Sequence, residues 1–319
     1  MRARLVELGW DSDLVVEPDG DQPTPSGDQV TIEVEACGVC GRDCIDRAGR
    51  FAFLQVPITP GHEAAGRVVA VGPDVTDWRV GDRVGTTHYA DGAILGLTID
   101  GGYATWLTAP QACFYAVPDD IDPALAAIFH CTLGTAWRGL HRAGLDRSSR
   151  VLVTGANGGV GAAALQICQG VGATSIAVVR REEDVEFVTA MGADDVLVDD
   201  GSTFHKHLPG GQVDIAMECV GAPTFNAALR SLIPGGRLVA IGNITGERIE
   251  LNIGYVITLG LHILGSTGAT REDMANLFDL NARQPLNVPI HDRLPLAEAD
   301  RAQRMVAAGG LRGRVVVVP

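Results

Sequence analysis

Two short stretches of the chain carry the side chains of a metal site. Residues 37–43 read Cys-Gly-Val-Cys-Gly-Arg-Asp, and residues 61–63 read Gly-His-Glu. Together they offer thiolate, imidazole and carboxylate groups, and Cys131 adds another thiolate later in the chain. Catalytic zinc takes three protein ligands and keeps one position open. Cys40, His62 and Cys131 can supply those ligands, so we expect zinc to polarise a substrate oxygen atom here.

The residues beside these candidate ligands fit supporting roles. Asp43 is not a metal ligand itself, but its position in the sequence allows it to orient a histidine that binds the metal. Glu63 is a carboxylate that can approach the metal when water exchanges for substrate. Cys37 and Cys40 also form a Cys-x-x-Cys pair, the pattern of a redox dithiol, but no βαβ pattern surrounds them. We therefore interpret Cys37 as a packed neighbour of the site.

A glycine-rich turn carries a second chemical signal. Residues 150–154 are typical of a strand buried in a parallel sheet, and residues 161–171 have a helical composition. Between them, residues 156–161 read Ala-Asn-Gly-Gly-Val-Gly, in the strand–turn–helix context of a dinucleotide-binding turn. Gly158 lets the backbone approach a pyrophosphate, Gly161 lets the helix pack closely on the sheet, and the helix N-terminus supplies N–H groups. The alternative is a tight turn without a ligand.

The end of the next strand bears on the identity of the dinucleotide. An NAD site usually has an acidic residue about 20 residues after the glycine-rich turn, where it binds the ribose 2′-hydroxyl. Here the strand ends in Val179-Arg180-Arg181, and the first acidic residues come later. Two guanidinium groups suit a 2′-phosphate through charge and bidentate hydrogen bonds. We predict that NADPH is preferred over NADH; the alternative is that both arginines are solvated surface charges.

Two patterns of secondary structure must position these residues. Up to about residue 123, short period-two strands are broken by proline and glycine, which predicts an irregular β-rich domain. Residues 123–143 form a long helical stretch, after which strands and helices alternate. Alternating βα units predict a doubly wound parallel sheet, so the fold class is α/β. We expect strands at residues 30–36, 66–72, 79–85, 150–154, 175–179, 195–198, 213–217, 236–241, 262–265 and 314–318, and a late helix at 297–307.

The composition limits the possible partners. The chain has 319 residues, enough for about two domains, and a formal net charge of −14. Such an acidic chain is repelled by phosphate, which argues against a nucleic-acid or membrane-surface partner. The sequence has no apolar stretch of about 20 residues to span a membrane, and its N-terminus lacks a signal-peptide pattern. Seven cysteines in a reducing compartment indicate metal ligands or free thiols, and we expect a cytoplasmic protein.

An ordered set of motifs resembles a known family. It comprises Cys37-Gly38-Val39-Cys40 with Asp43, Gly61-His62-Glu63, Val80-Gly81-Asp82-Arg83-Val84, Gly101-Gly102-Tyr103-Ala104, Cys131 and Gly158-Gly159-Val160-Gly161. Over essentially the whole chain, this set resembles the zinc-type medium-chain dehydrogenase/reductase superfamily. The resemblance implies a GroES-like catalytic domain over residues 1–123 and 268–319, a Rossmann domain over residues 124–267, and an active site in the cleft between them.

The resemblance also implies roles for individual residues. Zinc would be bound by Cys40, His62 and Cys131, while Thr135 would lie near the nicotinamide and Arg314 near the pyrophosphate. Family members commonly form a homodimer through the edge of the Rossmann sheet, which corresponds here to residues 251–265. The cofactor-binding positions implied beyond these are Gly158, Gly159, Val160, Gly161, Arg180, Arg181, Val220, Gly242, Asn243, Gly265 and Ser266.

Two departures from the family pattern bear on the reaction. Many members carry four closely spaced cysteines that hold a structural zinc, but this sequence has no cysteine between Val84 and Gly101, so we expect one catalytic zinc and no structural one. Alcohol dehydrogenases of the family usually have a serine or threonine before the motif aspartate and a histidine shortly after it, which relay the alcohol proton. This chain has Arg42 and Ile45 there, and arginine does not release a proton near neutral pH.

The residues around these departures resemble one branch of the family, the acryloyl-CoA reductases. The resemblance rests on Arg42, Arg47-x-Gly49-x-Phe51, Trp137-Arg138-Gly139-Leu140 and Gly235-Gly236-Arg237. Branch members reduce a carbon–carbon double bond conjugated to a carbonyl group, so we predict an NADPH-dependent enoyl-type reductase of a small molecule. The alternatives are an alcohol dehydrogenase or a ketone or aldehyde reductase on the same zinc site, and a non-catalytic protein that binds the dinucleotide and a partner.

Two roles stay open. Arg42 can hold an anionic group of the substrate or cofactor, or it can form a salt bridge with Asp43 or Asp46. The proton that completes the reduction comes from water or from an unassigned donor, for which His88, Tyr89 and His130 are the candidates.

Overall fold

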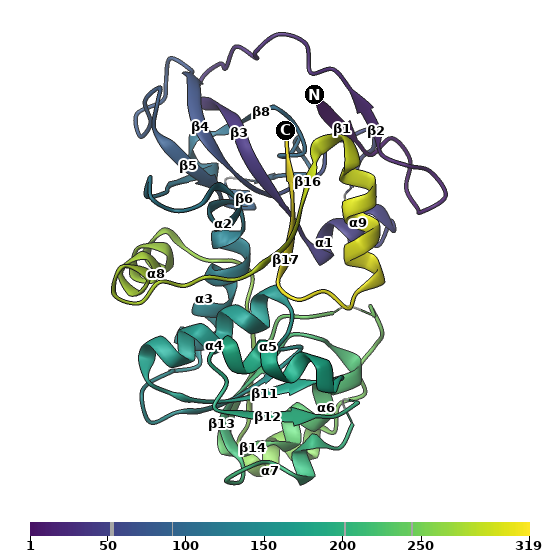
Figure 1. Ribbon diagram of the computed structural model, residues 1–319, viewed down its shortest axis with the longest axis vertical. Coiled ribbons are helices and arrows are strands. Elements are labelled where there is room, and N and C mark those ends of the chain that lie inside the picture. Colours follow the sequence, from purple (N-terminus) through teal and green to yellow (C-terminus); the bar gives the residue numbers. More distant parts are fainter. Residues whose placement is uncertain (52–53, 91, 201, 244) are drawn as a thin grey trace. The chain divides into compact units, whose positions relative to one another are not determined.

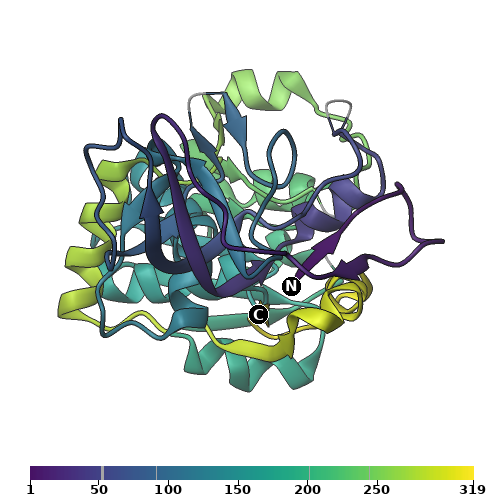
Figure 2. The ribbon, with the colours of Figure 1, turned by 90° about the horizontal axis from the view of Figure 1, so that it is seen from above.

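The computed structural model describes residues 1–51, 54–90, 92–200, 202–243 and 245–319 (Figure 1). The chain folds into two units. The first unit contains Met1–Cys131 and Ile290–Pro319, and the second contains Thr132–Pro289. Both termini belong to the first unit, where they lie side by side (Figures 1 and 2). Every helix in the described residues is too short or too polar to cross a membrane.

The first unit is built on a mostly antiparallel sheet. Its strand order is β16-β17-β3-β4-β5-β9, and β8 also pairs with β3. Apolar side chains of this sheet, such as Ile32, Leu107 and Val317, form the core. The strands are β3 (Gln29–Val39), β4 (Glu63–Val71), β5 (Arg83–Thr86), β8 (Trp106–Pro110), β9 (Phe114–Ala116), β16 (Ile290–Pro295) and β17 (Arg314–Val318). The remaining elements are β1 (Arg2–Arg4), β2 (Val15–Glu17), α1 (Gly41–Arg47), β6 (Tyr89–Ala90), β7 (Ala93–Ile94), η1 (Gln111–Cys113), α2 (Pro123–Ile128), η5 (Leu296–Glu298) and α9 (Ala299–Ala308).

One strand of the first unit starts later than the expected residues 79–85. Strand β5 begins at Arg83, because the preceding residues form a turn. Gly81 has a φ of 97°, in the left-handed region that favours glycine, and the Asp82 carboxylate accepts a hydrogen bond of 2.8 Å from the Arg79 N–H. The apparent alternation of apolar and polar residues over 79–82 is therefore turn chemistry.

The second unit is a doubly wound sheet whose strands all run parallel among the described residues. The strand order is β12-β11-β10-β13-β14-β15, so the winding reverses between β10 and β13. Ligands of open α/β sheets bind at such a switch point, beyond the carboxyl ends of the strands. The strands are β10 (Arg150–Thr154), β11 (Thr174–Val179), β12 (Asp195–Val198), β13 (Val213–Glu218), β14 (Leu232–Ala240) and β15 (His262–Gly265).

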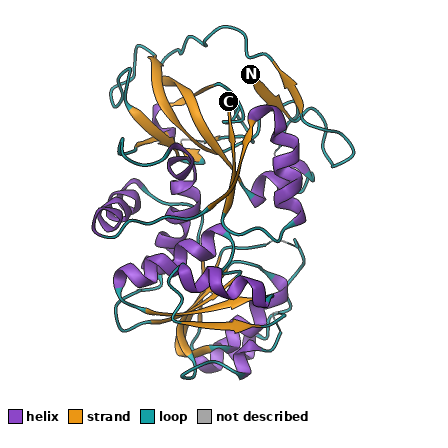
Figure 3. Cartoon of the chain, viewed as in Figure 1, coloured by secondary structure: helices purple, strands orange, loops and turns teal. Residues whose placement is uncertain are grey.

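Helices cover both faces of this parallel sheet (Figure 3). The apolar run Val151–Val153 in the middle of the sheet is fully buried, as a strand covered on both faces requires. The helix after it, α4, ends at Gly172, whose φ of 85° caps the C-terminus. The helical elements are α3 (Thr135–Arg142), α4 (Gly159–Val171), η3 (Glu182–Asp184), α5 (Val185–Ala190), η4 (Phe204–Lys206), α6 (Ala222–Arg230), α7 (Ile253–Leu259) and α8 (Arg271–Arg283).

Both boundaries between the units lie later in the chain than the expected positions after residues 123 and 267. Helix α2 stays with the first unit because it packs against β3 and β4. Helix α8 stays with the second unit because it contacts α3, where Arg138 Nη1 lies 3.1 Å from Asp273 Oδ2. Tertiary packing sets both boundaries, and the composition of the chain does not display it.

The expected long helix over residues 123–143 is interrupted. Helix α2 is followed by a π-helical turn, η2 (Phe129–Gly134), and then by α3. A π-helical turn is wider than an α-helical one and is frequent at functional sites. It carries the candidate ligand Cys131.

Candidate functional site

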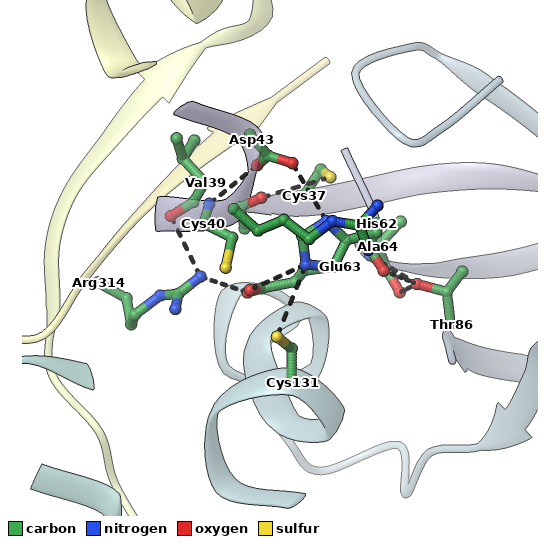
Figure 4. Close-up of polar contacts among 12 residues, drawn as sticks. Cys37, Val39, Cys40, Asp43, His62, Glu63, Ala64, Thr86, Cys131 and Arg314 are labelled. Carbon is green, nitrogen blue, oxygen red and sulfur yellow. Dashed lines mark hydrogen bonds and ion pairs between the residues drawn. The ribbon is translucent and has the colours of Figure 1, made fainter. Parts of the chain in front are cut away.

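Four side chains of the first unit come together as a possible metal site. Cys40, His62, Glu63 and Cys131 each offer one ligand atom, and these atoms all lie within 4.8 Å of one another. His62 Nε2 is 3.6 Å from Cys131 Sγ and 3.7 Å from Glu63 Oε1 (Figure 4). The structure thus brings together the three zinc ligands expected from the sequence, with the expected carboxylate beside them.

Neighbouring elements of the first unit deliver these residues. Strands β3 and β4 are antiparallel, and Gly38 is directly opposite Glu63, so the ends that carry Cys40 and His62 are adjacent. Gly38 has no space for a side chain, because an added Cβ would lie 2.8 Å from Ile128 Cγ2. Close contact between β3 and α2 therefore places the π-helical turn with Cys131 beside the strand ends.

Asp43 fixes the orientation of the candidate ligands. Its Oδ1 is 3.1 Å from His62 Nδ1, while its Oδ2 accepts hydrogen bonds from the Cys40 N–H at 2.9 Å and the Tyr103 hydroxyl at 3.0 Å. Burial acts to lower the pKa of His62, but the charge and hydrogen bond of Asp43 raise it well above its ordinary value. Once the ring gives up its Nε2 proton, as a metal ligand must, Nδ1–H still donates to Asp43 and the lone pair of Nε2 faces the thiols.

The charges of the remaining donors depend on burial and on one arginine. A hydrogen bond from the Cys131 thiol lowers the pKa of Cys40 well below its ordinary value. Burial raises the pKa of Glu63 to about 7, against the opposing charge of Arg314. Arg314 Nη2 lies 2.5 Å from Glu63 Oε2 and also donates to the Val39 carbonyl at 3.1 Å (Figure 4). The residue expected near the pyrophosphate is therefore held in a buried ion pair beside the metal donors.

The donor set fits zinc. Two thiols, an imidazole nitrogen and a carboxylate oxygen are its usual protein ligands. Within the described residues, Glu63 Oε1 is buried without a hydrogen-bond partner, and such an atom costs free energy unless something binds it. A cation among these four groups would satisfy that oxygen and draw protons from both thiols.

Arg42 forms one of the two salt bridges considered from the sequence. Its Nε lies 3.2 Å from Asp46 Oδ2 on the next turn of α1. Its guanidinium carbon is 5.2 Å from the centre of the Phe51 ring. Burial raises the pKa of Asp46 to about 6, which the charge of Arg42 opposes.

The glycine-rich turn of the second unit has the form expected for phosphate binding. Helix α4 starts at Gly159 after an N-cap at Gly158 and has no side-chain cap, so its first N–H groups remain available to a ligand. At Gly161, an added Cβ would lie 2.6 Å from Ala156 Cα and closer still to the Gly155 carbonyl oxygen. Only glycine lets the helix approach the strand this closely.

A buried carboxylate that sequence reasoning missed supports this turn. Glu218, at the end of β13, accepts hydrogen bonds from the Thr154 hydroxyl at 2.8 Å and from the Gly221 N–H at 2.7 Å. It also accepts from the Thr224 hydroxyl and from the Val220 N–H. Burial raises its pKa. The available signal was an acidic residue directly after the apolar strand 213–217.

The other expected cofactor residues gather at the same end of the sheet. An added Cβ on Gly221 would lie 3.2 Å from Asn243 Cα, and one on Gly242 would collide with the Cys219 carbonyl that precedes Val220. The Ser266 hydroxyl donates to the Thr135 carbonyl at 3.0 Å, and Arg142 donates to the Gly265 carbonyl at 2.7 Å. The carboxyl ends of β13, β14 and β15 therefore meet at one edge.

The two arginines after β11 differ in their surroundings. Arg181 pairs with Glu183 at 2.8 Å and with Asp184 at 3.0 Å, so its guanidinium group is held by acidic neighbours. Arg180 is exposed and has no ion pair in the described part of the chain. Of these two guanidinium groups, only that of Arg180 has no ion pair with a described residue.

Comparisons with known proteins match both units of the chain. The model of the alcohol dehydrogenase GroES-like domain matches residues 26–119, and the model of the zinc-binding dehydrogenase domain matches residues 159–283. An acryloyl-coenzyme A reductase of Metallosphaera sedula is 32% identical over 313 residues, which cover 92% of this chain and 93% of that protein. An NAD-dependent alcohol dehydrogenase of Saccharolobus solfataricus is 30% identical, with both chains fully covered. The crystal structure of AibC has a TM-score of 0.90 and 35% identity, covering 100% of this chain and 95% of that one.

Proposed function

Because the chain belongs to the zinc-type medium-chain dehydrogenase/reductase superfamily, we propose that it is an NADPH-dependent reductase of a carbon–carbon double bond conjugated to a carbonyl group. The observation that carries this proposal is Arg42, which stands where alcohol dehydrogenases of the family usually have a hydroxyl and which lies 3.2 Å from Asp46. A guanidinium keeps its protons near neutral pH, so it does not relay the proton of an alcohol. The similarity to an acryloyl-coenzyme A reductase supports the same reaction class.

The metal part of the proposal is one catalytic zinc ion held by Cys40, His62 and Cys131. When bound, zinc supplies a Lewis acid that polarises a carbonyl oxygen. Asp43 keeps the His62 ring in the ligand orientation, and Arg314 balances the charge of Glu63. No structural zinc is included, because the sequence between Val84 and Gly101 contains no cysteine.

The cofactor part of the proposal is a preference for NADPH over NADH. The exposed guanidinium of Arg180 is free to pair with a 2′-phosphate, whereas Arg181 is already bound to Glu183 and Asp184. The N–H groups at the start of α4 suit the pyrophosphate, since Gly158 and Gly159 leave the backbone uncovered. Glu218 holds the neighbouring strand ends in place.

We also propose a homodimer that forms through the edge of the parallel sheet. Strand β15 is the last strand of that sheet, so its outer side has unpaired backbone groups. The adjacent helix α7 has no buried residue, and Ile253 and Ile257 are 60% and 72% exposed. A second copy would pair with this edge and cover both isoleucines.

The direct test is a matched pair of substrates given to the zinc-loaded protein with NADPH. We expect 2-cyclohexen-1-one, or an α,β-unsaturated thioester, to be reduced to the saturated carbonyl compound, identified by mass spectrometry. Cyclohexanone, the saturated partner, should not be reduced. An alcohol as the product would instead favour the alternative of a carbonyl reductase or alcohol dehydrogenase. The relative from S. solfataricus is named as an alcohol dehydrogenase. Tight NADPH binding without turnover of either compound would favour the non-catalytic alternative.

A further inference from the structure

A histidine outside the candidate ligand set lies against the metal site. His88 follows β5 in the loop between Val84 and Gly101. Its ring centroid is 6.2 Å from that of His62, with the two planes at 73°, and 5.9 Å from that of His130. His62 and the neighbour of His130, Cys131, are both candidate zinc ligands. The imidazole of His88 therefore borders the donors on which a substrate oxygen would bind.

The hydrogen bonding of His88 is incomplete. Its Nδ1 is buried, and no hydrogen-bond partner exists for it among the described residues. More than nine in ten buried polar groups in folded proteins have such a partner, so Nδ1 is open to a ligand that supplies one. The rest of the residue is well fixed, since the His88 carbonyl accepts a hydrogen bond of 3.2 Å from the Leu95 N–H.

The ring of His88 offers the kind of group that such a site can use. An imidazole in its neutral form has one N–H donor and does not repel a nearby cation, so it can hold a ligand oxygen next to a metal. The nitrogen of His88 without a partner among the described residues, Nδ1, is the atom that can carry this N–H.

We propose that His88 is a substrate-binding residue, whose Nδ1–H donates a hydrogen bond to the carbonyl oxygen of an α,β-unsaturated carbonyl compound. A carbonyl oxygen has two lone pairs, so it can bind a metal ion and accept this hydrogen bond at once. The oxygen gains negative charge as the conjugated double bond is reduced, and a fixed donor stabilises that charge more than it stabilises the bound substrate. The inference rests on the proposed function only in taking a carbonyl compound as the ligand.

The test uses the full-length zinc-loaded protein with three substitutions. His88→Phe keeps a ring against His62 and His130 but removes the donor. His88→Asn places an amide N–H near the position of Nδ1 and should restore part of the function. His291→Phe makes the same chemical change at an exposed position of β16 and is the matched control. We expect kcat for 2-cyclohexen-1-one to fall about 10- to 100-fold in His88→Phe, to recover at least threefold in His88→Asn, and to stay unchanged in the control.

A measurement on the wild-type protein provides a readout besides turnover. In 15N-histidine NMR spectra, the Nδ1 resonance of His88, assigned by its loss in His88→Phe, should shift when cyclohexanone is added. Zinc content should stay at one ion per chain in every variant. A resonance that does not move, or a kcat for His88→Phe within twofold of wild type, would show that His88 only packs against the ligands. A shift without reduction of the enone would contradict the proposed function and leave the role of His88 intact.

Discussion

Asp43 is the residue on which the arrangement of the metal donors depends most. It contacts His62, the backbone of Cys40 and Tyr103 through one carboxylate. We predict that Asp43→Asn weakens zinc binding about 10- to 100-fold, because the amide no longer fixes the His62 ring by a charged hydrogen bond. Competition with a chromophoric chelator measures this affinity. Asp46→Asn, the same change on the same helix, is the control and should leave zinc affinity within twofold.

Asp46 itself predicts a dependence of stability on pH. Burial raises its pKa from an ordinary 3.8 to about 6, so between these values the folded chain binds a proton that the unfolded chain has released. This proton stabilises the fold below about pH 4, and its contribution of roughly 2–3 kcal/mol disappears as the pH rises to 6. The side chain of asparagine does not bind or release a proton in this pH range. The free energy of unfolding of Asp46→Asn, relative to wild type, should therefore improve by that amount between pH 4 and pH 7.

Denaturant titrations at pH 4, 5 and 7 measure this difference. Subtracting wild type from variant removes the contributions of other carboxylates, which are common to both proteins. A difference that is the same at all three pH values would mean that Asp46 titrates normally in the folded protein.

At the scale of elements, two glycines in the turn between β10 and α4 have different roles: one affects the stability of the fold, and the other affects NADPH binding. Gly161→Ala should lower the free energy of unfolding by about 1–3 kcal/mol, because the new Cβ meets Ala156 and the Gly155 carbonyl. Gly158→Ala should lower the free energy of unfolding by less, since its Cβ would lie 3.3 Å from the Gly155 oxygen, a tight contact that a shift of a few tenths of an ångström relieves, and its φ of −79° suits alanine. It should instead weaken NADPH binding at least tenfold by covering the backbone.

Thermal unfolding and fluorescence titration with NADPH distinguish the two glycine variants. Equal NADPH affinities for Gly158→Ala and wild type would show that the pyrophosphate does not approach the backbone at this turn.

The sequence predicted the elements whose patterns are local. Strands β10, β12, β15 and β17 have the bounds expected from their apolar runs. Residues 79–82 alternate in polarity as a strand does, but they form a turn. The π-helical turn could not be predicted, because its composition is that of an ordinary helix. The Arg314–Glu63 ion pair joins residues 251 positions apart, so no local pattern could reveal it. The candidate ligands were found because side-chain chemistry itself limits which residues can bind zinc.

At the scale of the whole molecule, the proposed dimer depends on an uncharged surface in an acidic chain. Helix α7 reads Ile-Gly-Tyr-Val-Ile-Thr-Leu, without a charged residue, although the net charge of the chain is −14. Interfaces exclude charge from their centres, so we predict that Ile257→Lys converts the dimer to a monomer. Sedimentation velocity at micromolar concentration measures this change.

Val80→Lys is the control for that substitution. Val80 is similarly exposed, at 66%, but belongs to the first unit. The same charge there should leave the dimer intact. A dimer that survives Ile257→Lys would place the interface elsewhere.

The π-helical turn Phe129–Gly134 makes the metal site sensitive to chain length as well as to residue identity. A π-helical turn holds about one residue more than an α-helical turn. Deleting a single residue between Ile128 and Cys131 would let the segment wind as a regular α-helix, and would move the thiol, which lies inside the wider turn, from its present position. Every ligand would still be encoded, yet one of them would no longer lie among the others. In genetic terms, loss of the metal can arise here from a one-codon deletion that leaves all three ligand codons unchanged.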